Sequence, residues 1–269
     1  MAETDDFEDE VSRDEIALEP SEAADPRELV AQMIPTDLME KYEVYSYRSA
    51  ATILRMSHSD LFEELCQALR EFSIDEAMIR TAGGNESDIP KLISANLRPK
   101  DWRETIIRGD LEVQKIAKRY VTASKTGKPL KKPKYEKMPP ETITREKYLD
   151  GHKVDYVKGK VAFDLEWNSK DQTFDRDLYA FSAFAQTGVV DVGVLVTRGT
   201  EMTDYIKGLG PALTKSGQIE MKDGKPRTTA AKYGASTTWM GKLLYRLNAG
   251  RNGACPVLVF GITPRCVQD

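Results

Sequence analysis

Three acidic residues lie within one short apolar stretch, KVDYVKGKVAFDLEW, which covers residues 153 to 167. Asp155 precedes a Lys-Gly pair, and Asp164 and Glu166 follow that pair, two residues apart. Carboxylates that lie close together are unfavourable unless a positive charge lies between them, and they are preferred ligands of hard divalent ions such as Mg²⁺. One interpretation of the pattern is therefore a metal site. A hairpin face whose acids are simply solvated is the alternative, because an acid-x-acid pair is a weak motif.

A β-hairpin would bring these acids together. A two-residue turn at 158–159 sets Asp155 opposite Ala162 and makes Asp155 and Asp164 diagonal neighbours, on the same face as Glu166. A three-residue turn would move Asp155 to the opposite face. The other face should pack into the core, and it holds Val161, Phe163, Leu165 and Trp167.

The elements around the hairpin predict an α/β fold. Before it, a helix is expected over 59–72 with Ser59 as N-cap, then a break at Gly83 and Gly84 with a helix restarting near Ser87, and a helical segment around Trp102 to Arg108. After it, the sequence predicts a helix over 174–186 with Asp175 as N-cap, a buried strand over 191–197, a helix from Ser236 and a last strand over 256–263. This order predicts a mixed β-sheet flanked by helices, with a helical N-terminal half.

Charge is distributed unevenly along the chain. Residues 1 to 25 hold eleven acids and one base, so the other 244 residues hold 38 bases and 32 acids. A basic body suggests a polyanionic partner, and the acidic segment predicts a disordered tail over 1–27 that either competes with that partner or only aids solubility. The Pro-rich and Lys-rich segment 125–141 predicts a linker or basic loop, because proline excludes it from helices and central strands.

The remaining chain, 28–269, is expected to form one domain, with a helical part over about 28–124 and an α/β core over 150–269. Three scattered cysteines, Cys66, Cys255 and Cys266, predict reduced thiols in a cytoplasmic protein. No signal peptide or long apolar run is present, so no membrane association is expected. His58 and His152 lack metal-ligand spacing.

Several motifs resemble a known family. Asp155, eight intervening residues and Asp164-Leu165-Glu166 in a β-β-α-β order resemble the PD-(D/E)xK nuclease core. The segments FDLEWNSKDQTFDRDLYAF, DVGVLVTR, MGKLLYRLNAGRNGACPVLVFGITP and GGNES resemble the BglII/BstYI group of type II restriction endonucleases. The resemblance covers about residues 45 to 265 and implies a restriction-endonuclease-like fold.

The resemblance implies Mg²⁺-dependent hydrolysis of phosphodiester bonds in double-stranded DNA, at a short palindrome centred on GATC, by a homodimer. Asp155 and Asp164 match the metal ligands. Glu166 replaces the usual lysine, so it would either act on the attacking water or help to hold the ion. A second framing uses Asp155, Glu166 and Asn168. Lys170 is either the displaced lysine or a contact to phosphate or solvent.

Basic residues suggest where DNA would bind. Lys128, Lys131 and Lys132 suit phosphate contacts, or belong to a solvated loop. Arg227 and Lys232 lie in a segment, 225–238, that is long enough to reach base edges. Two other functions remain open: a structure-specific or repair nuclease on the same core, and a DNA-binding regulator that does not cleave. The helical N-terminal half and the helix from Ser236 to Asn248 are the expected dimer interface.

Overall fold

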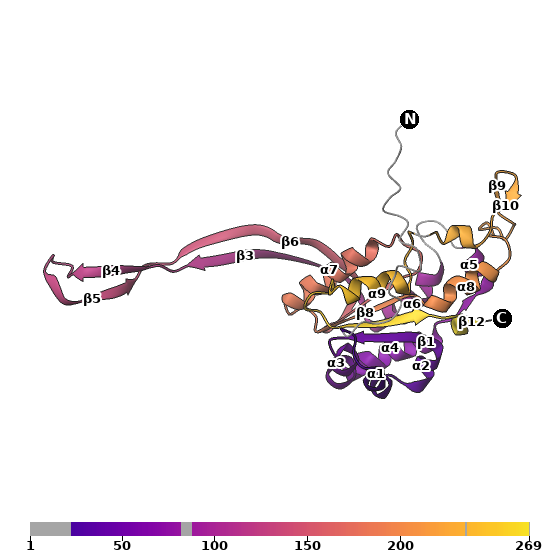
Figure 1. The fold of residues 1–269 in the computed structure, drawn as a ribbon, viewed down its shortest axis with the longest axis horizontal. Helices are drawn as coiled ribbons and strands as arrows, with labels where there is room; N and C mark the ends of the chain where they lie inside the picture. Colours follow the sequence, from indigo (N-terminus) through magenta and orange to yellow (C-terminus); the bar gives the residue numbers. More distant parts are fainter. Residues whose placement is uncertain (1–22, 82–87, 235, 269) are drawn as a thin grey trace. The chain divides into compact units, whose positions relative to one another are not determined.

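The computed structural model describes residues 23–81, 88–234 and 236–268 (Figure 1). Expectations for residues 1–22 of the acidic tail and for the break at Gly83 and Gly84 therefore lie outside the described residues. The described chain divides into two compact units. Residues 106–152 form the second unit, and the segments on either side of them form the first.

A mixed sheet forms the centre of the first unit, and its described strands lie in the order β1-β11-β8-β7-β6-β3. Their bounds are β1 Tyr42–Tyr47, β11 Val257–Ile262, β8 Val192–Arg198, β7 Val161–Glu166, β6 Glu141–Lys158 and β3 Arg103–Lys115. Strands β11, β8 and β7 are parallel, while β1 and β6 run antiparallel to their neighbours β11 and β7. The three parallel strands are buried at every position, as their nearly continuous apolar sequences predict.

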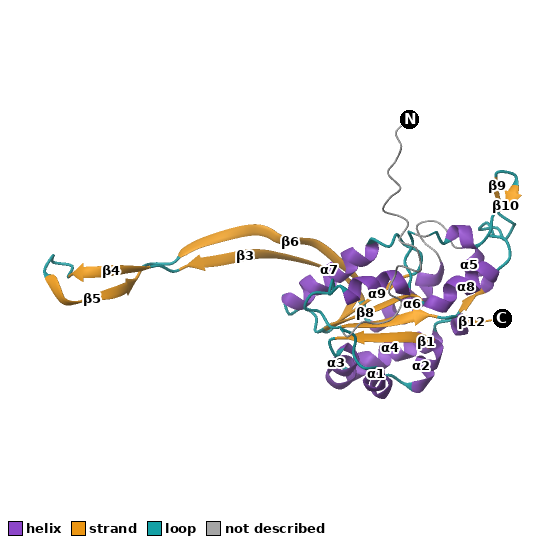
Figure 2. Cartoon of the chain, in the orientation of Figure 1, coloured by secondary structure: helices purple, strands orange, loops and turns teal. Residues whose placement is uncertain are grey.

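Helices cover both faces of this sheet (Figures 1 and 2). The N-terminal helices are α1 Arg27–Met33, α2 Thr36–Lys41, α3 Ala50–Ser57, α4 Ser59–Glu71, α5 Glu76–Thr81 and α6 Asp88–Leu97. Their apolar side chains form one core with Phe163, Val194 and Phe260 of the sheet. The later helices are α7 Thr173–Gln186, α8 Thr200–Gly208 and α9 Met240–Asn248. Of these, α7 packs on β7, β8 and α9. The predicted α/β fold is confirmed.

Short elements complete the first unit: β2 Ile74–Asp75, β9 Met221–Lys222, β10 Lys225–Pro226, β12 Val267–Gln268, and the 3₁₀ turns Arg98–Lys100, Ala230–Lys232 and Pro264–Cys266. All three cysteines are buried free thiols, as expected. None of the described helices is both long and apolar enough to cross a membrane.

Four expectations about these elements were wrong. Ser59 is not the N-cap of α4; His58 holds that position, and Ser59 is the first residue of the helix. The segment from Trp102 to Arg108 is not helical, because β3 begins at Arg103 and half-buried and exposed residues alternate along it. Asp175 is not the N-cap of α7; Gln172 holds that position, and Asp175 pairs with arginines of α9 and its following turn. Helix α9 begins at Met240 rather than at Ser236.

The second unit consists of residues 106–115 of β3, residues 141–152 of β6 and a hairpin of β4 Lys118–Ala123 and β5 Pro129–Lys137. The expected linker or loop over 125–141 is therefore wrong, since β5 occupies most of it. Two prolines are tolerated because β5 pairs only with β4, which leaves its other edge without a ladder. Tyr120 and Tyr135 face each other across this pair, with ring centroids 5.0 Å apart. Residues 106–152 hold twelve bases and six acids.

Candidate active site

The β6–β7 hairpin has a different register from the expected one. Its pairs are Tyr156 with Phe163, Val157 with Ala162 and Lys158 with Val161. The turn is therefore Gly159–Lys160, one residue later than predicted, and Gly159 has a φ of 54°. The register brings Asp155 directly beside Asp164 instead of diagonal to it, and the Asp155 amide donates to Asp164 Oδ1 at 3.2 Å. The shift preserves the face, so the acids still project from one side.

The opposite face packs as predicted, since Val161, Phe163, Leu165 and Trp167 are all buried in the core with the N-terminal helices. On the acidic face, Asp164 is 3% exposed and Glu166 is 7% exposed. Asp155 differs, because its side chain is 46% exposed and lies 3.5 Å from the Lys153 ammonium. The hairpin therefore presents one accessible carboxylate beside two buried ones.

Helix α7 adds a fourth acid, Asp177, that the sequence analysis missed. Its side chain is 2% exposed, and its Oδ1 accepts two hydrogen bonds of 3.2 Å from the Arg176 guanidinium. Its Oδ2 is buried and has no hydrogen-bond partner. The signal was present in the sequence: Asp177 lies three residues after Phe174 and four before Phe181, which places it on the apolar face of the helix. Asp164, Glu166 and Asp177 are the only buried acids among the described residues.

These carboxylates perturb one another. Burial raises the pKa of Asp164 well above its usual value, and the charges of Asp177, Asp155 and Glu166 raise it further. Burial also raises the pKa of Glu166, against the opposing effects of Ser169 and Arg176. Burial and Glu166 together raise the pKa of Asp177 to about 8. The site is thus short of positive charge, which is the condition that a bound cation relieves.

The residues present fit a divalent metal in their chemistry. All four side chains are oxygen donors of the kind that Mg²⁺ prefers, and one carboxylate oxygen, Asp177 Oδ2, is buried without a partner. Within the described part of the chain, no three His, Cys, Asp or Glu side chains already surround a common point as metal ligands would. Binding would therefore require the carboxylates to close around the ion.

The backbone that carries Glu166 is firmly anchored. Its carbonyl accepts hydrogen bonds from the hydroxyls of Thr197, at 2.8 Å, and Thr238, at 3.3 Å. Arg198 is 1% exposed and donates to the Trp167 carbonyl at 2.9 Å and to the Thr238 carbonyl at 2.6 Å. These bonds join β7, β8 and the segment before α9, and they explain why that helix begins only at Met240.

Two other predicted site residues form their hydrogen bonds with the segment before α9 and not with the acids. The Lys170 ammonium donates to Ser236 Oγ at 3.2 Å, and its backbone pairs with Thr237. The Asn168 amide donates to the Lys232 carbonyl at 3.2 Å, and its Oδ1 is buried without a partner. Both side chains therefore face the segment before α9.

The predicted DNA contacts fall into two groups. Arg227 and Lys232 both pair with Glu220, at 2.7 and 2.6 Å, and the Lys232 side chain is only 6% exposed. Both side chains therefore already form ion pairs within the first unit. In the second unit, Lys128, Lys131 and Lys132 are exposed at and beside the β4–β5 turn, and no acid of the described chain pairs with them.

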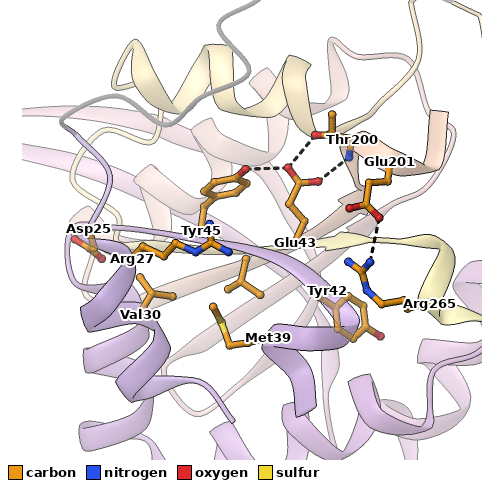
Figure 3. A pocket seen from close by; sticks show the side chains of 11 residues that line it. Asp25, Arg27, Val30, Met39, Tyr42, Glu43, Tyr45, Thr200, Glu201 and Arg265 are labelled. Carbon is orange, nitrogen blue, oxygen red and sulfur yellow. Dashed lines mark hydrogen bonds and ion pairs between the residues drawn. The ribbon is translucent and has the colours of Figure 1, made fainter. Parts of the chain in front are cut away.

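A pocket of about 630 Å³ lies along β1, far from the acids in strand order, because β11 and β8 separate β1 from β7. Several of its polar groups are already paired with one another (Figure 3). Glu43 accepts hydrogen bonds from the Tyr45 hydroxyl and from the Thr200 amide and hydroxyl, and Glu201 pairs with Arg265 at 3.1 Å. Glu43 is thereby the hydrogen-bond acceptor for Thr200, the first residue of α8. The buried acids remain the better candidate for catalysis.

Comparison with known proteins agrees with this choice. No curated protein matches the sequence closely enough to count as a relative. The family model described as restriction endonuclease BglII/BglIII matches residues 42–262, from the start of β1 to the end of β11, and this range includes all four acids. The chain belongs to the BglII/BglIII restriction endonuclease family.

Proposed function

We propose that the protein is a cytoplasmic type II restriction endonuclease, which cuts both strands of DNA at a short palindrome centred on GATC and requires Mg²⁺. Membership of a restriction endonuclease family makes the chain a DNA-cleaving hydrolase. The observation that carries the finer proposal is the position of Asp164, buried between Asp155, Glu166 and Asp177 at the matched β-hairpin. A protein that only binds DNA has no use for buried acids that repel phosphate.

The residues of the site have separate roles in this proposal. Asp155 and Asp164 would hold the ion, which would polarise the phosphate and make water a stronger nucleophile. Glu166 takes the proton from the attacking water, and its raised pKa suits a general base. The water oxygen bonds to phosphorus as the bond to the 3′ oxygen breaks, and the 3′ oxygen leaves with the electron pair and takes a proton from solvent water. Hydrogen bonds from Thr197 and Thr238 hold the Glu166 backbone in place for this step.

DNA binding is assigned mainly to the second unit. Residues 106–152 hold twelve bases and six acids, whereas residues 23–105 and 153–269 together hold 26 bases and 27 acids. The excess of positive charge outside the tail thus lies in the second unit, where Lys128, Lys131 and Lys132 contact phosphates. Arg227 and Lys232 would contact DNA bases only if their ion pairs with Glu220 were broken.

Assembly follows from the number of sites. Cutting both strands of a palindrome requires two active sites related by a two-fold axis, and the described part of the chain has one cluster of buried acids. We therefore assign the protein as a homodimer. Met56 on α3, in the helical N-terminal half, is 72% exposed and Tyr245 on α9 is 50% exposed, so each part of the chain expected at the interface carries a large exposed apolar side chain.

Incubating the purified protein with plasmid DNA and Mg²⁺ tests the function. Discrete fragments whose ends share one palindromic sequence are expected, and EDTA should abolish them. Degradation without fixed ends, or cleavage only at branched or damaged DNA, would favour a repair nuclease. A mobility shift without cleavage, in Mg²⁺ and in Mn²⁺, would favour a regulator.

A further inference from the structure

We propose that Asp177 is a further carboxylate ligand of the cation site, and that Arg176 is the counter-ion that occupies the site when no cation is bound. This inference rests on the proposed function and adds to it a helix residue outside the hairpin motif. Asp177 is not in the first turn of α7, so it has no capping role that would explain its burial.

The burial of Asp177 requires a reason. A buried carboxylate oxygen without a hydrogen-bond donor is costly, and such groups persist where a charge or ion compensates them. Arg176 satisfies only Oδ1, and Oδ2 has no partner. The Arg176 guanidinium that contacts Asp177 Oδ1 also lies 3.8 Å from Glu166 Oε1, so the Asp177 carboxylate is close to the acid cluster.

The charge balance leaves room for one divalent ion. Four carboxylates face two neighbouring bases, Lys153 and Arg176. Lys153 is a partial counter-ion only, because it lies 2.7 Å from Glu104 but 3.5 Å from Asp155. With all four carboxyls ionised, as a bound cation favours, the cluster has an excess of about two negative charges, which one Mg²⁺ or Mn²⁺ would neutralise.

Arg176 lies where a competing cation would be expected. Its guanidinium is 3.2 Å from Asp177 Oδ1 and 3.8 Å from Glu166 Oε1, so it spans two of the carboxylates. Its side chain is 69% exposed, unlike those of its two partners. It can therefore turn into solvent when an ion binds, at a small cost in lost contacts.

The two residues give predictions of opposite sign for cation affinity. In DNA-free protein titrated with Mn²⁺ and followed by electron paramagnetic resonance of the free ion, Asp177→Asn should weaken binding by about tenfold or more. Arg176→Gln should strengthen it several-fold, because it removes the competing charge. Asp175→Asn is the matched control: it is the same substitution on the same helix, but Asp175 pairs with Arg246 and Arg251. Its affinity should stay within about twofold of the wild type.

Thermal melting without cations separates a ligand from a structural residue. Asp177→Asn should melt at or above the wild-type temperature, because it relieves crowding of like charges; a structural role predicts a lower temperature. Unchanged Mn²⁺ affinity in Asp177→Asn, in an enzyme that still cuts plasmid, would overturn this inference alone. Tight Mn²⁺ binding that Asp177→Asn removes, without cleavage of any DNA, would instead overturn the proposed function. If Asp177→Asn does not fold, unchanged affinity in Arg176→Gln overturns the inference.

Discussion

Replacing Lys128, Lys131 and Lys132 together with glutamine should weaken the salt dependence of DNA binding. All three side chains are exposed in a unit with twelve bases and six acids, and no acid of the described chain neutralises them. Each phosphate contact contributes about 0.9 to the slope of log affinity against log salt, so three contacts contribute about 2.7. Between about 50 and about 200 mM salt, the wild type should therefore lose about 40-fold more affinity than the variant.

Fluorescence anisotropy with a labelled random duplex in EDTA measures this slope without cleavage. The control variant replaces Lys91, Lys160 and Lys207 with glutamine. Their side chains are 58%, 56% and 59% exposed, and each pairs with an acid of the first unit. Both variants lose three positive charges, but only the first should flatten the slope. An unchanged slope in the first variant, or an equal loss in both, would refute the assignment of phosphate binding to the second unit.

Three further predictions concern the tail, the fold and assembly. Deleting residues 1–22 removes ten acids and one base, so random DNA should bind more tightly at low salt while the cleavage sequence stays the same. The deletion stops before Asp25 because Asp25 accepts hydrogen bonds from Ser46 and Ser49. Unchanged affinity for random DNA at every salt concentration would contradict the prediction. Burial acts to raise the pKa of Glu64, but hydrogen bonds from Lys158 and Trp102 outweigh it and lower that pKa, so Glu64→Gln should cost about 1.5–3 kcal/mol of unfolding free energy at neutral pH. That stabilisation is present above the unfolded-state pKa of about 4.3 and is lost as the pH falls through the lower folded-state value, so wild-type and variant melting temperatures should converge in acid; a constant difference down to about pH 2 would contradict it. Sedimentation with a short duplex carrying the site should give two chains per duplex, and one chain per duplex that still cuts both strands would exclude the dimer.

Local pattern was sufficient for much of the α/β core. The helices at 59–72 and 174–186 have clear apolar periods, because each buries one face. The strands β8 and β11 are instead nearly continuous apolar runs, because they are buried on both faces. The hairpin register depended on a finer signal. A glycine at the first position of a two-residue turn suits type II′, and Gly159 takes that position with its positive φ. A Cβ on residue 159 would lie only 3.1 Å from the Leu61 side chain, which also suits glycine at this position.

Other features depended on contacts that the local sequence does not specify. Strand β1 joins the sheet through β11, more than 200 residues later in the chain, so its six residues gave no local sign of their partner. Strand β5 forms despite Pro129 and Pro133 because it pairs on one edge only. Asp177 joins the acids only through the packing of α7 on β7. A charged residue on an apolar helix face was the one available sign of it.

Single-turnover cleavage by Asp164→Asn, compared with the wild type, tests the central claim most directly. DNA binding should be measured in parallel by anisotropy, with Asp204→Asn, an exposed acid on α8, as the control. The account predicts that Asp164→Asn cuts at least about a hundredfold more slowly in Mg²⁺ while it binds DNA at least as tightly and melts no lower than the wild type. Cleavage by Asp164→Asn at the wild-type rate would contradict the claim that these buried acids are the active site.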